Sequence, residues 1–461
     1  MCFFAVCLCP LIGMILGCKE SSSENRALAE FPSMKTEAGI NTYWLSQAGE
    51  YFQEHFAFRS ALVTANALLQ GRLLGVSTEQ AVIQGSDGWL YYKDSLADYL
   101  GTEPLPERSL YNIAHTLSMT QKQLERKEIR FAFTIAPNKN SLYGDNMPYY
   151  YKYKATEKKN LKGLKKFLEQ EQVNYVDLYE MFAAQPEVLY HQRDSHWNNK
   201  GAAMAADEIM TVLEKEHDSY DNETFEIRRD FVGDLDNMLY PEAPTLEDEI
   251  YYKKKLTYEF VEQVSSNFAP RITTLNSEKK GSLVMYRDSF GNTLLPFMAD
   301  AYEKAYFSRG VPYQFSDIDT NQADTVVIER AERFLPEMAQ SPPVLEGARL
   351  LWNGKIERKA ENGTRDMKMK LQGRLLQISG RILSQYLDTT SRIYLRINNE
   401  ELYEAFPMDV ELEEGCDAGG FCLYVNADRV LENGIQVEVM IQDEEALQII
   451  DSKLIKEEIN K

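Results

Sequence analysis

The sequence predicts an α/β fold with a parallel sheet between layers of helices, followed by a small β-sandwich. Residues 129–136 are mostly apolar, as expected of a strand that is buried on both faces of a parallel sheet. Helical patterns flank this strand at residues 109–127 and 156–170, and a short strand follows at 174–178. Strand and helix therefore alternate as in a βαβ unit, whose two strands run parallel.

The α/β pattern continues to about residue 340. A helix over 292–304 and a strand over 325–329 complete it, and Ser341-Pro342-Pro343 is typical of a linker. We therefore expect one α/β domain over residues 40–340.

The remainder of the chain has the pattern of short strands. Between residues 371 and 447, alternating runs are separated by turns such as Asn398-Asn399 and Asn433-Gly434. This spacing predicts a small antiparallel β-sandwich within a β-rich domain over residues 344–461.

Composition limits the class of protein. A chain of 461 residues is too long for one core, so two or three domains are expected. The chain has 71 Asp and Glu against 50 Lys and Arg, a net charge of −21. An acidic surface repels nucleic acid and anionic membranes, so we expect no nucleic-acid partner. We also expect no cofactor.

The first 18 residues form an uncharged, mostly apolar run that suits the core of a signal peptide. Its ending, Ile15-Leu16-Gly17-Cys18, resembles a bacterial lipobox, which would make Cys18 the lipidated first residue of the mature protein. Residues 19–39 are rich in Ser and Glu and are expected to be a tether. An uncleaved N-terminal anchor is the alternative, and both interpretations place the remaining chain outside the cytoplasm.

The strongest chemical signal is the pair Asp194 and His196, in a chain with only five histidines. An acid that orients an imidazole, and an imidazole that removes a proton from a hydroxyl, are two parts of a catalytic triad. Ser289 is the candidate third part, because the apolar run 282–286 breaks at Asp288-Ser289 before a helical segment. Such a strand-to-helix corner exposes a hydroxyl beside unpaired N–H groups.

Two motifs carry a resemblance to a known family. The block Asp194-Ser195-His196-Trp197-Asn198 and the later block Tyr286-Arg287-Asp288-Ser289-Phe290-Gly291 resemble the SGNH-hydrolase-like proteins of alginate O-acetylation and the related DHHW proteins. The order of Asp and His before Ser is also that of this group. Ser195 replaces the first His of the DHHW name, and Arg287 replaces a Gly that is usual in SGNH proteins.

The resemblance covers about residues 51–335 and implies a fold and an activity. The implied fold is the SGNH-hydrolase-like three-layer sandwich. The implied activity is transfer of an acetyl group, supplied by a membrane-bound partner, to an exported polysaccharide through an acetyl-serine intermediate. If water replaces the sugar hydroxyl, the protein is an acetyl esterase. A non-catalytic polysaccharide-binding or assembly protein with the same fold is a further alternative.

Further site residues are expected near the triad. The backbone N–H groups of Ser289 and Gly291, with the side chain of Asn138 or Asn292, are candidate oxyanion donors. Lys139 follows the strand that ends at residue 136 and is a candidate for binding an acidic group of the substrate. Tyr143 and Trp197 are candidate stacking surfaces for a sugar, although aromatic residues are more often part of the core.

Three alternatives concern metals, the connecting segment and the cysteines. The spacing of His191, Asp194 and His196 permits a metal site, and the pair Asp234 and Asp236 suggests calcium, but neither set of ligands is complete, so we expect no metal. Residues 216–280 are expected to be an insertion that covers or shapes the substrate groove. Cys416 and Cys422 flank five residues that could form a hairpin turn, so both a disulfide and two free buried thiols remain open.

Overall fold

The computed structural model of the protein describes residues 2–16, 29–36, 39–74, 77–263, 266–413, 415–429, 434–443 and 446–455. Cys18, most of the expected tether at 19–39 and Asn433 lie outside these residues.

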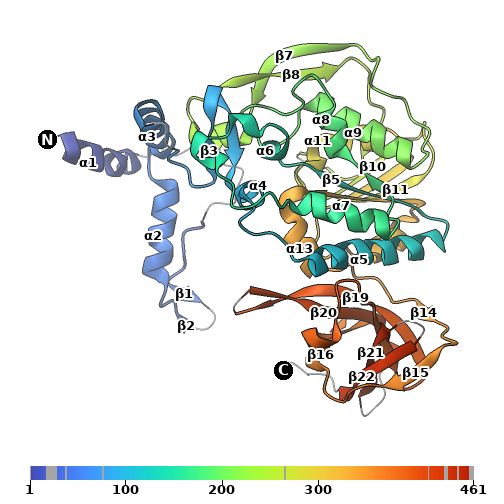
Figure 1. The fold of residues 1–461 in the computed structure, drawn as a ribbon. Coiled ribbons are helices and arrows are strands. Elements are labelled where there is room, and N and C mark those ends of the chain that lie inside the picture. Colours follow the sequence, from blue (N-terminus) through green and yellow to red (C-terminus); the bar gives the residue numbers. More distant parts are fainter. Residues whose placement is uncertain are drawn as a thin grey trace.

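A seven-stranded sheet forms the centre of the α/β domain (Figure 1). Its order is β6 (Tyr175–Val176), β5 (Arg130–Ala136), β13 (Thr325–Ala331), β11 (Ser282–Tyr286), β12 (Lys304–Ser308), β10 (Arg271–Leu275) and β9 (Glu259–Phe260). The first five strands are parallel, as predicted, whereas β10 and β9 are antiparallel. Every residue of β13 is buried, including the charged residues Glu329 and Arg330. The α/β fold is confirmed, with a mixed sheet in place of a purely parallel one.

Helices cover both faces of the sheet and complete the three layers. One core contains Leu283 and Met285 of β11 together with α8 (Leu178–Ala183), α9 (Asn199–Val212) and α11 (Gly291–Ala299). The opposite core contains Val284 and Tyr286 with α5 (Glu107–Glu125), α7 (Asn160–Gln170), α12 (Ser316–Asn321) and α13 (Leu335–Gln340). Alternate side chains of β11 thus point into different cores, as the pleat of a strand requires.

Shorter elements lie beside the carboxyl edge of the sheet. Residues 82–92 form an antiparallel hairpin of β3 (Val82–Gln84) and β4 (Leu90–Tyr92). The connecting segment 216–280 contains a second hairpin and a short helix. The hairpin is β7 (Phe225–Val232) with β8 (Leu246–Tyr252), and the helix is α10 (Asp234–Leu239). Two further short helices are α4 (Leu96–Leu100) and α6 (Lys139–Leu142).

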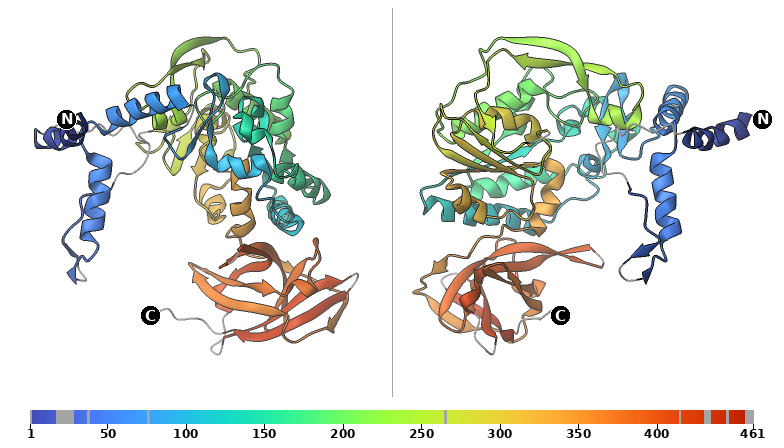
Figure 2. Two further views of the ribbon diagram at one scale, coloured as in Figure 1. Left: turned by 60° about the vertical axis from the view of Figure 1, so that its left-hand side comes forward. Right: turned by 180° about the vertical axis from the view of Figure 1, so that it is seen from behind.

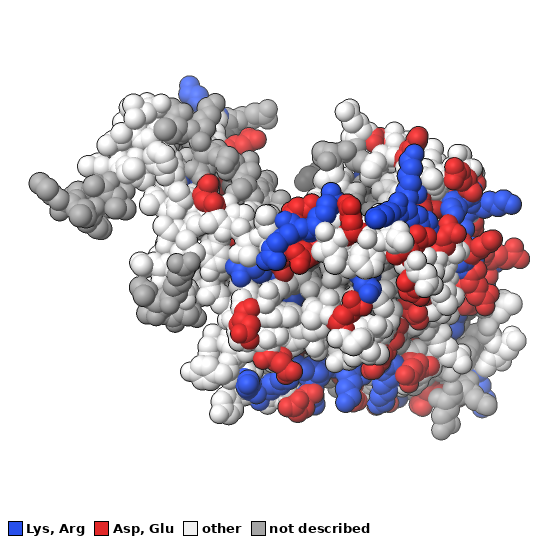
Figure 3. Space-filling view, turned by 90° about the horizontal axis from the view of Figure 1, so that it is seen from above, with Lys and Arg blue, Asp and Glu red and all other residues white. Residues whose placement is uncertain are grey.

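The N-terminal part projects from the α/β domain (Figures 1 and 2). It comprises α1 (Cys2–Ile15), β1 (Lys35–Thr36), β2 (Gly39–Ile40), α2 (Trp44–His55) and α3 (Arg59–Leu74). Helices α2 and α3 are separated at Phe58, which has a positive φ of 65°. Among the described residues, no helix has both the length and the apolar character needed to span a membrane. In Figure 3 basic and acidic side chains are interspersed over the α/β domain, whereas this N-terminal part has few of either.

The C-terminal part is a β domain of mostly antiparallel strands, as predicted. Nine strands form one sheet whose inward side chains share a single core. Only the β15–β22 pair is parallel among the described strand pairs of this sheet. The strands are β14 (Arg349–Leu350), β15 (Lys355–Arg358), β16 (Thr364–Gln372), β17 (Leu375–Ile382), β18 (Ile393–Ile397), β19 (Glu401–Leu412), β20 (Gly415–Asn426), β21 (Ile435–Asp443) and β22 (Ala446–Ile455).

Cys416 and Cys422 both lie on β20, so the hairpin turn expected between them is wrong. A strand rises about 3.3 Å per residue, so six residues separate the two Cα atoms by roughly 20 Å. A disulfide requires a Cα separation of about 4.4–6.8 Å. Both thiols are free, Cys416 exposed and Cys422 buried.

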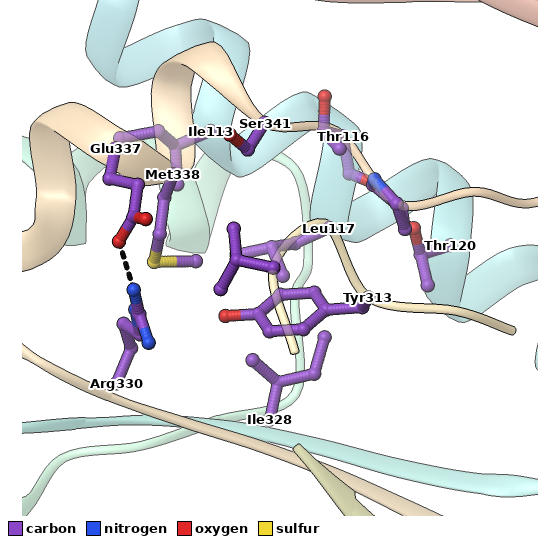
Figure 4. A pocket seen from close by; sticks show the side chains of 12 residues that line it. Ile113, Thr116, Leu117, Thr120, Tyr313, Ile328, Arg330, Glu337, Met338 and Ser341 are labelled. Atoms are coloured by element: carbon purple, nitrogen blue, oxygen red, sulfur yellow. Dashed lines mark hydrogen bonds and ion pairs between the residues drawn. The ribbon is translucent and has the colours of Figure 1, made fainter. Parts of the chain in front are cut away.

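Helix α5 packs against β19, and buried polar contacts join the two domains. Asn112 Nδ2 donates to Asp409 Oδ1 at 3.0 Å. The His115 ring lies between Glu171 Oε2, 2.8 Å from Nδ1, and Glu404 Oε1 of β19, 2.9 Å from Nε2. Close to this interface, α5, α13 and β13 enclose a cavity of about 20 Å³ that is lined mainly by apolar side chains and contains no triad residue (Figure 4).

Candidate active site

Ser289 lies at the predicted corner between β11 and α11. Asp288 fixes this corner: its Oδ1 accepts from the N–H of Phe290 at 2.9 Å, and its Oδ2 accepts from the N–H of Ala331 at 2.7 Å. Ser289 remains partly exposed, although its neighbours Asp288 and Phe290 are buried. The corner therefore presents one hydroxyl to the surface from a rigid support.

Arg287 occupies the position where SGNH proteins usually have Gly, and its side chain is buried within the corner. Its guanidinium donates to the carbonyls of Asn267 at 2.9 Å and Ala269 at 3.0 Å, and to Asn292 Oδ1 at 2.5 Å. A Cβ on Gly291 would lie 2.6 Å from the Cβ of Arg287, so only glycine fits beside this arginine. Arg287 therefore fastens the corner to residues 267–269.

His196 and Asp194 reach Ser289 from the loop that precedes α9. His196 Nε2 lies 2.9 Å from Ser289 Oγ, and His196 Nδ1 lies 2.7 Å from Asp194 Oδ1. Asn198 caps α9, since its side chain accepts from the N–H of Gly201 at 2.9 Å. An isolated bridge between Tyr190 and Trp197 closes the loop at its base. The structure thus brings Asp194 and His196 together with Ser289, which lies 93 positions beyond His196 in the sequence.

The electrostatic environment favours an ion pair between the acid and the imidazole. Burial alone raises the pKa of Asp194, but His196 and the hydrogen bonds from His196 and Asp234 outweigh burial and hold this pKa well below its usual range. Burial likewise lowers the pKa of His196, and the charge of Asp194 outweighs it, so the pKa of His196 is raised. Asp194 can therefore both orient the ring and stabilise the imidazolium that forms during acyl transfer.

Asp234 supports the triad from α10, a role that the sequence did not reveal. Its N–H donates to Asp194 Oδ2 at 2.7 Å. Its carboxylate accepts from the N–H of Ser195 at 2.8 Å and from the Ser195 hydroxyl at 2.6 Å. Ser195 Oγ is in turn 3.2 Å from His196 Nδ1, and Asp234 Oδ2 is 3.6 Å from the same nitrogen. Burial and the neighbouring Asp194 raise the pKa of Asp234.

Lys139 holds the backbone of the catalytic loop and has no free donor for a substrate. Its ammonium donates to the carbonyls of His191 at 3.2 Å, Gln192 at 3.0 Å and Asp194 at 2.5 Å. An ammonium has three donors, and all three are used. Burial lowers the pKa of Lys139 to about 8. The expectation that Lys139 binds an acidic group of the substrate is therefore wrong.

The connecting segment 216–280 also holds this loop. Glu247 of β8 accepts from the N–H groups of Gln192 at 2.7 Å and Arg193 at 2.9 Å. Glu249 accepts from the N–H of Asn199 at 3.1 Å and lies 2.9 Å from His191 Nε2. Glu247 and Glu249 of β8 therefore fix the position of the catalytic loop.

The three oxyanion candidates lie in different surroundings. Among the described residues, no acceptor binds the N–H of Ser289 or of Gly291. Asn292 Oδ1 accepts from Arg287, so the amide nitrogen of Asn292 points away from the guanidinium. Asn138, at the carboxyl end of β5, is 2% exposed, and neither atom of its amide group has a partner. All three groups lie at the same edge of the sheet as Ser289 and stay candidates.

Trp197 and Tyr143, the two candidate stacking surfaces for a sugar, differ in exposure. Trp197 is only 1% exposed and packs against Phe290 and Phe182 beneath the triad, so its interpretation as a sugar-stacking surface is wrong. Tyr143 is half-buried, its ring lies 5.5 Å from that of Trp89, and its hydroxyl accepts from the N–H of Leu189 at 3.0 Å.

The residues proposed for metals do not converge as the sequence suggested. The ring of His191 stacks on Phe231 at 3.7 Å and bonds to Glu249, so it does not join Asp194 and His196. Asp234 binds Ser195, whereas Asp236 pairs with Arg193. Among the described residues, Asp194, His196 and Asp234 do lie close enough to share an ion, but hydrogen bonds within the group already use their ligand atoms.

The sheet, the corner and the acid–histidine loop form one α/β domain that carries the Asp194, His196 and Ser289 side chains together. Residues 82–280 match the family described as SGNH hydrolase-like domain, acetyltransferase AlgX. The predicted resemblance to proteins of this group is therefore confirmed. No curated protein matches the chain.

Several solved structures resemble this chain at low sequence identity. Bacillus cereus PatB1 has 16% identity and a TM-score of 0.43, over 55% of this chain and 96% of its own. A DHHW family protein from Eubacterium siraeum has 18% identity and a TM-score of 0.41, over 55% and 95%. Pseudomonas aeruginosa AlgX has 13% identity and a TM-score of 0.34, over 78% and 94%.

Proposed function

We propose that this protein is an O-acetyltransferase that acts on an exported or cell-surface polysaccharide through an acetyl group on Ser289. The observation that carries the proposal is the continuous hydrogen-bonded chain from Asp194 through His196 to Ser289, at 2.7 and 2.9 Å. These distances suit a general base that takes a proton from a nucleophile. The match of residues 82–280 to an acetyltransferase domain supports the choice of an acetyl group.

The proposed reaction has two halves. Ser289 Oγ attacks the carbonyl carbon of the donor, and its proton passes to His196 Nε2. The N–H groups of Ser289 and Gly291 stabilise the oxyanion, with Asn138 or Asn292 as a further donor. The donor's leaving group departs with the proton from His196. A sugar hydroxyl then attacks the acetyl carbonyl, its proton passes to His196, and Ser289 regains a proton as the ester with the sugar is released.

The proposed site of action is the outer face of the membrane. The motif that ends at Cys18 supports a lipid anchor, and a membrane-bound partner would supply the acetyl group. Cys18→Ala should abolish lipid attachment, measured by labelling with a fatty-acid analogue. A native protein without lipid that keeps its first 17 residues would favour the uncleaved anchor.

Transfer of labelled acetyl from p-nitrophenyl acetate to a panel of oligosaccharides tests the proposal. The expected result is acetylated sugar with the wild-type chain and none with Ser289→Ala. Release of acetate without acetylated sugar would make the protein an esterase. Sugar binding that is equal in both proteins, with no turnover, would make it a binding protein.

A further inference from the structure

Arg333 lies next to the triad, on the short segment after β13. Its guanidinium carbon is 4.9 Å from the ring centre of Phe334, 5.4 Å from that of Tyr92 and 5.5 Å from that of Phe290. Three aromatic rings from three parts of the chain therefore hold the guanidinium in one place. Such contacts stabilise a cation without neutralising it.

Phe290 connects this guanidinium to the reacting groups. It follows Ser289 directly, and its ring centre lies 4.8 Å from that of His196, at an interplanar angle of 67°. The positive charge of Arg333 acts on His196, opposing the rise in the pKa of the imidazole that Asp194 causes. Arg333, Ser289 and His196 are each partly exposed, so a bound molecule can reach all three.

Arg333 differs from the other arginines of this region in lacking an anionic partner. Arg330, in β13 just before this segment, pairs with Glu337 (Figure 4). Arg193 pairs with Asp236, and Arg287 donates to four acceptors. Within the described part of the chain, no carboxylate or carbonyl accepts a hydrogen bond from Arg333, and its buried Nε has no partner. In a protein with 71 acidic residues, an unpaired guanidinium beside the nucleophile points to an anion from outside the chain.

We propose that Arg333 is a specificity-determining residue, which binds an anionic substituent of the sugar that accepts the acetyl group. The inference rests on the proposed function and adds the chemical class of the acceptor. A guanidinium presents parallel N–H groups that match a carboxylate or a phosphate. Phe290 contacts both the Arg333 guanidinium and the His196 ring, so an anion bound to Arg333 lies near the reacting groups.

The test compares acceptors that differ only in charge, with the full-length chain and p-nitrophenyl acetate as donor. The acceptors are a uronic acid oligosaccharide, its carboxyl-reduced neutral counterpart and a phosphorylated form of the neutral one. Wild-type kcat/KM should be roughly 10- to 100-fold higher for a charged acceptor than for the neutral one, the range of one charge-assisted contact. Arg333→Gln should bring this ratio close to 1, mainly through KM, whereas Arg333→Lys should keep part of it.

Lys93→Gln is the matched control, since Lys93 is an exposed cation one residue after Tyr92. It should keep the wild-type ratio, because it removes the same charge without removing the contact. Preference for the carboxylate or for the phosphate form distinguishes the two anions. An equal loss with charged and neutral acceptors in Arg333→Gln, or no preference in the wild type, would overturn the inference.

A binding measurement separates failure of this inference from failure of the proposed function. Calorimetry of the charged oligosaccharide with Ser289→Ala should give a Kd at least 10-fold lower than with Ser289→Ala/Arg333→Gln. The difference is expected even if no form of the protein transfers acetyl. Equal affinities of the two proteins would overturn the role of Arg333, whatever the activity of the wild type.

Discussion

The N–H of Asp234 donates to Asp194 Oδ2 at 2.7 Å, which joins the triad acid to a helix that follows it by 40 residues. The carboxylate of Asp234 accepts from both the N–H and the hydroxyl of Ser195. Asp234 therefore fixes the acid and the residue next to the histidine together. The structure gives it a supporting role for His196 and not the role of a nucleophile or base.

Asp234→Asn should lower turnover by about 10- to 100-fold, since a small displacement of a catalytic group costs up to that factor. Loss of the negative charge 3.6 Å from His196 Nδ1 should also lower the pKa of the imidazole. The midpoint of the acid limb of the pH–rate profile, measured with a small acetyl ester, should therefore move down. Reduced turnover with an unchanged midpoint would mean that Asp234 only supports the fold.

The wild-type pH profile follows from the state of His196. The imidazole must be neutral to accept a proton, and Asp194 raises its pKa above the usual value of about 6.5 for histidine. Activity should therefore fall as pH decreases through a midpoint above about 6.5.

Asp194→Asn should move this midpoint down and reduce turnover by roughly 10³- to 10⁴-fold, because the amide neither stabilises the imidazolium nor fixes the reactive tautomer. Titration of the His196 ring by NMR checks the same shift without relying on turnover. An Asp194→Asn protein with the wild-type midpoint would contradict the pairing.

His115 gives a prediction for stability at the contact between the domains. Burial lowers the pKa of His115, but the hydrogen bonds to Glu171 and Glu404 outweigh it, so the folded-state pKa is raised. A raised histidine pKa contributes stability that is complete below the unfolded value of about 6.5 and is lost as pH rises through the folded value.

The wild type should therefore exceed His115→Gln in free energy of unfolding most at acidic pH, and the difference should decrease above about pH 6.5. Urea unfolding of both proteins at several pH values measures it. A difference that does not depend on pH would show that His115 acts through packing alone. The contacts of Asn112 with Asp409 and of His115 with Glu404 also give a prediction for truncation. Removal of the residues after Ser341 leaves these polar groups of α5 unpaired, so the α/β domain alone should be less stable than the whole chain.

The sequence predicted the features that depend on local pattern. The run before Ser289 is continuous and apolar because β11 is buried on both faces, and the corner appears where that run stops. The parallel strands of the sheet and the alternating strands of the C-terminal domain were also predicted from local patterns. Asp194 and His196 could be identified from the sequence because both lie in one short loop.

Features that depend on contacts between distant segments were not predicted. The spacing of Asp234 and Asp236 suggested calcium, because nothing in the local sequence shows that the N–H of Asp234 donates to Asp194. Lys139 resembles a substrate ligand until the three carbonyls around its ammonium are known. Arg333 has no motif of its own, because its position depends on rings from three segments. Cys416 and Cys422 were misplaced because Gly419-Gly420, which lies between them, is typical of a turn, whereas both glycines lie within β20.

The central claim is that Ser289 carries the acetyl group between donor and acceptor. Its Oγ lies 2.9 Å from His196 Nε2, which is the distance expected for proton transfer from a nucleophile. Mass spectrometry after incubation with p-nitrophenyl acetate, without an acceptor, tests this most directly. The account predicts one added acetyl group on the peptide that contains Ser289, and none in His196→Ala. An unmodified Ser289 peptide, together with full activity of Ser289→Ala, would contradict it.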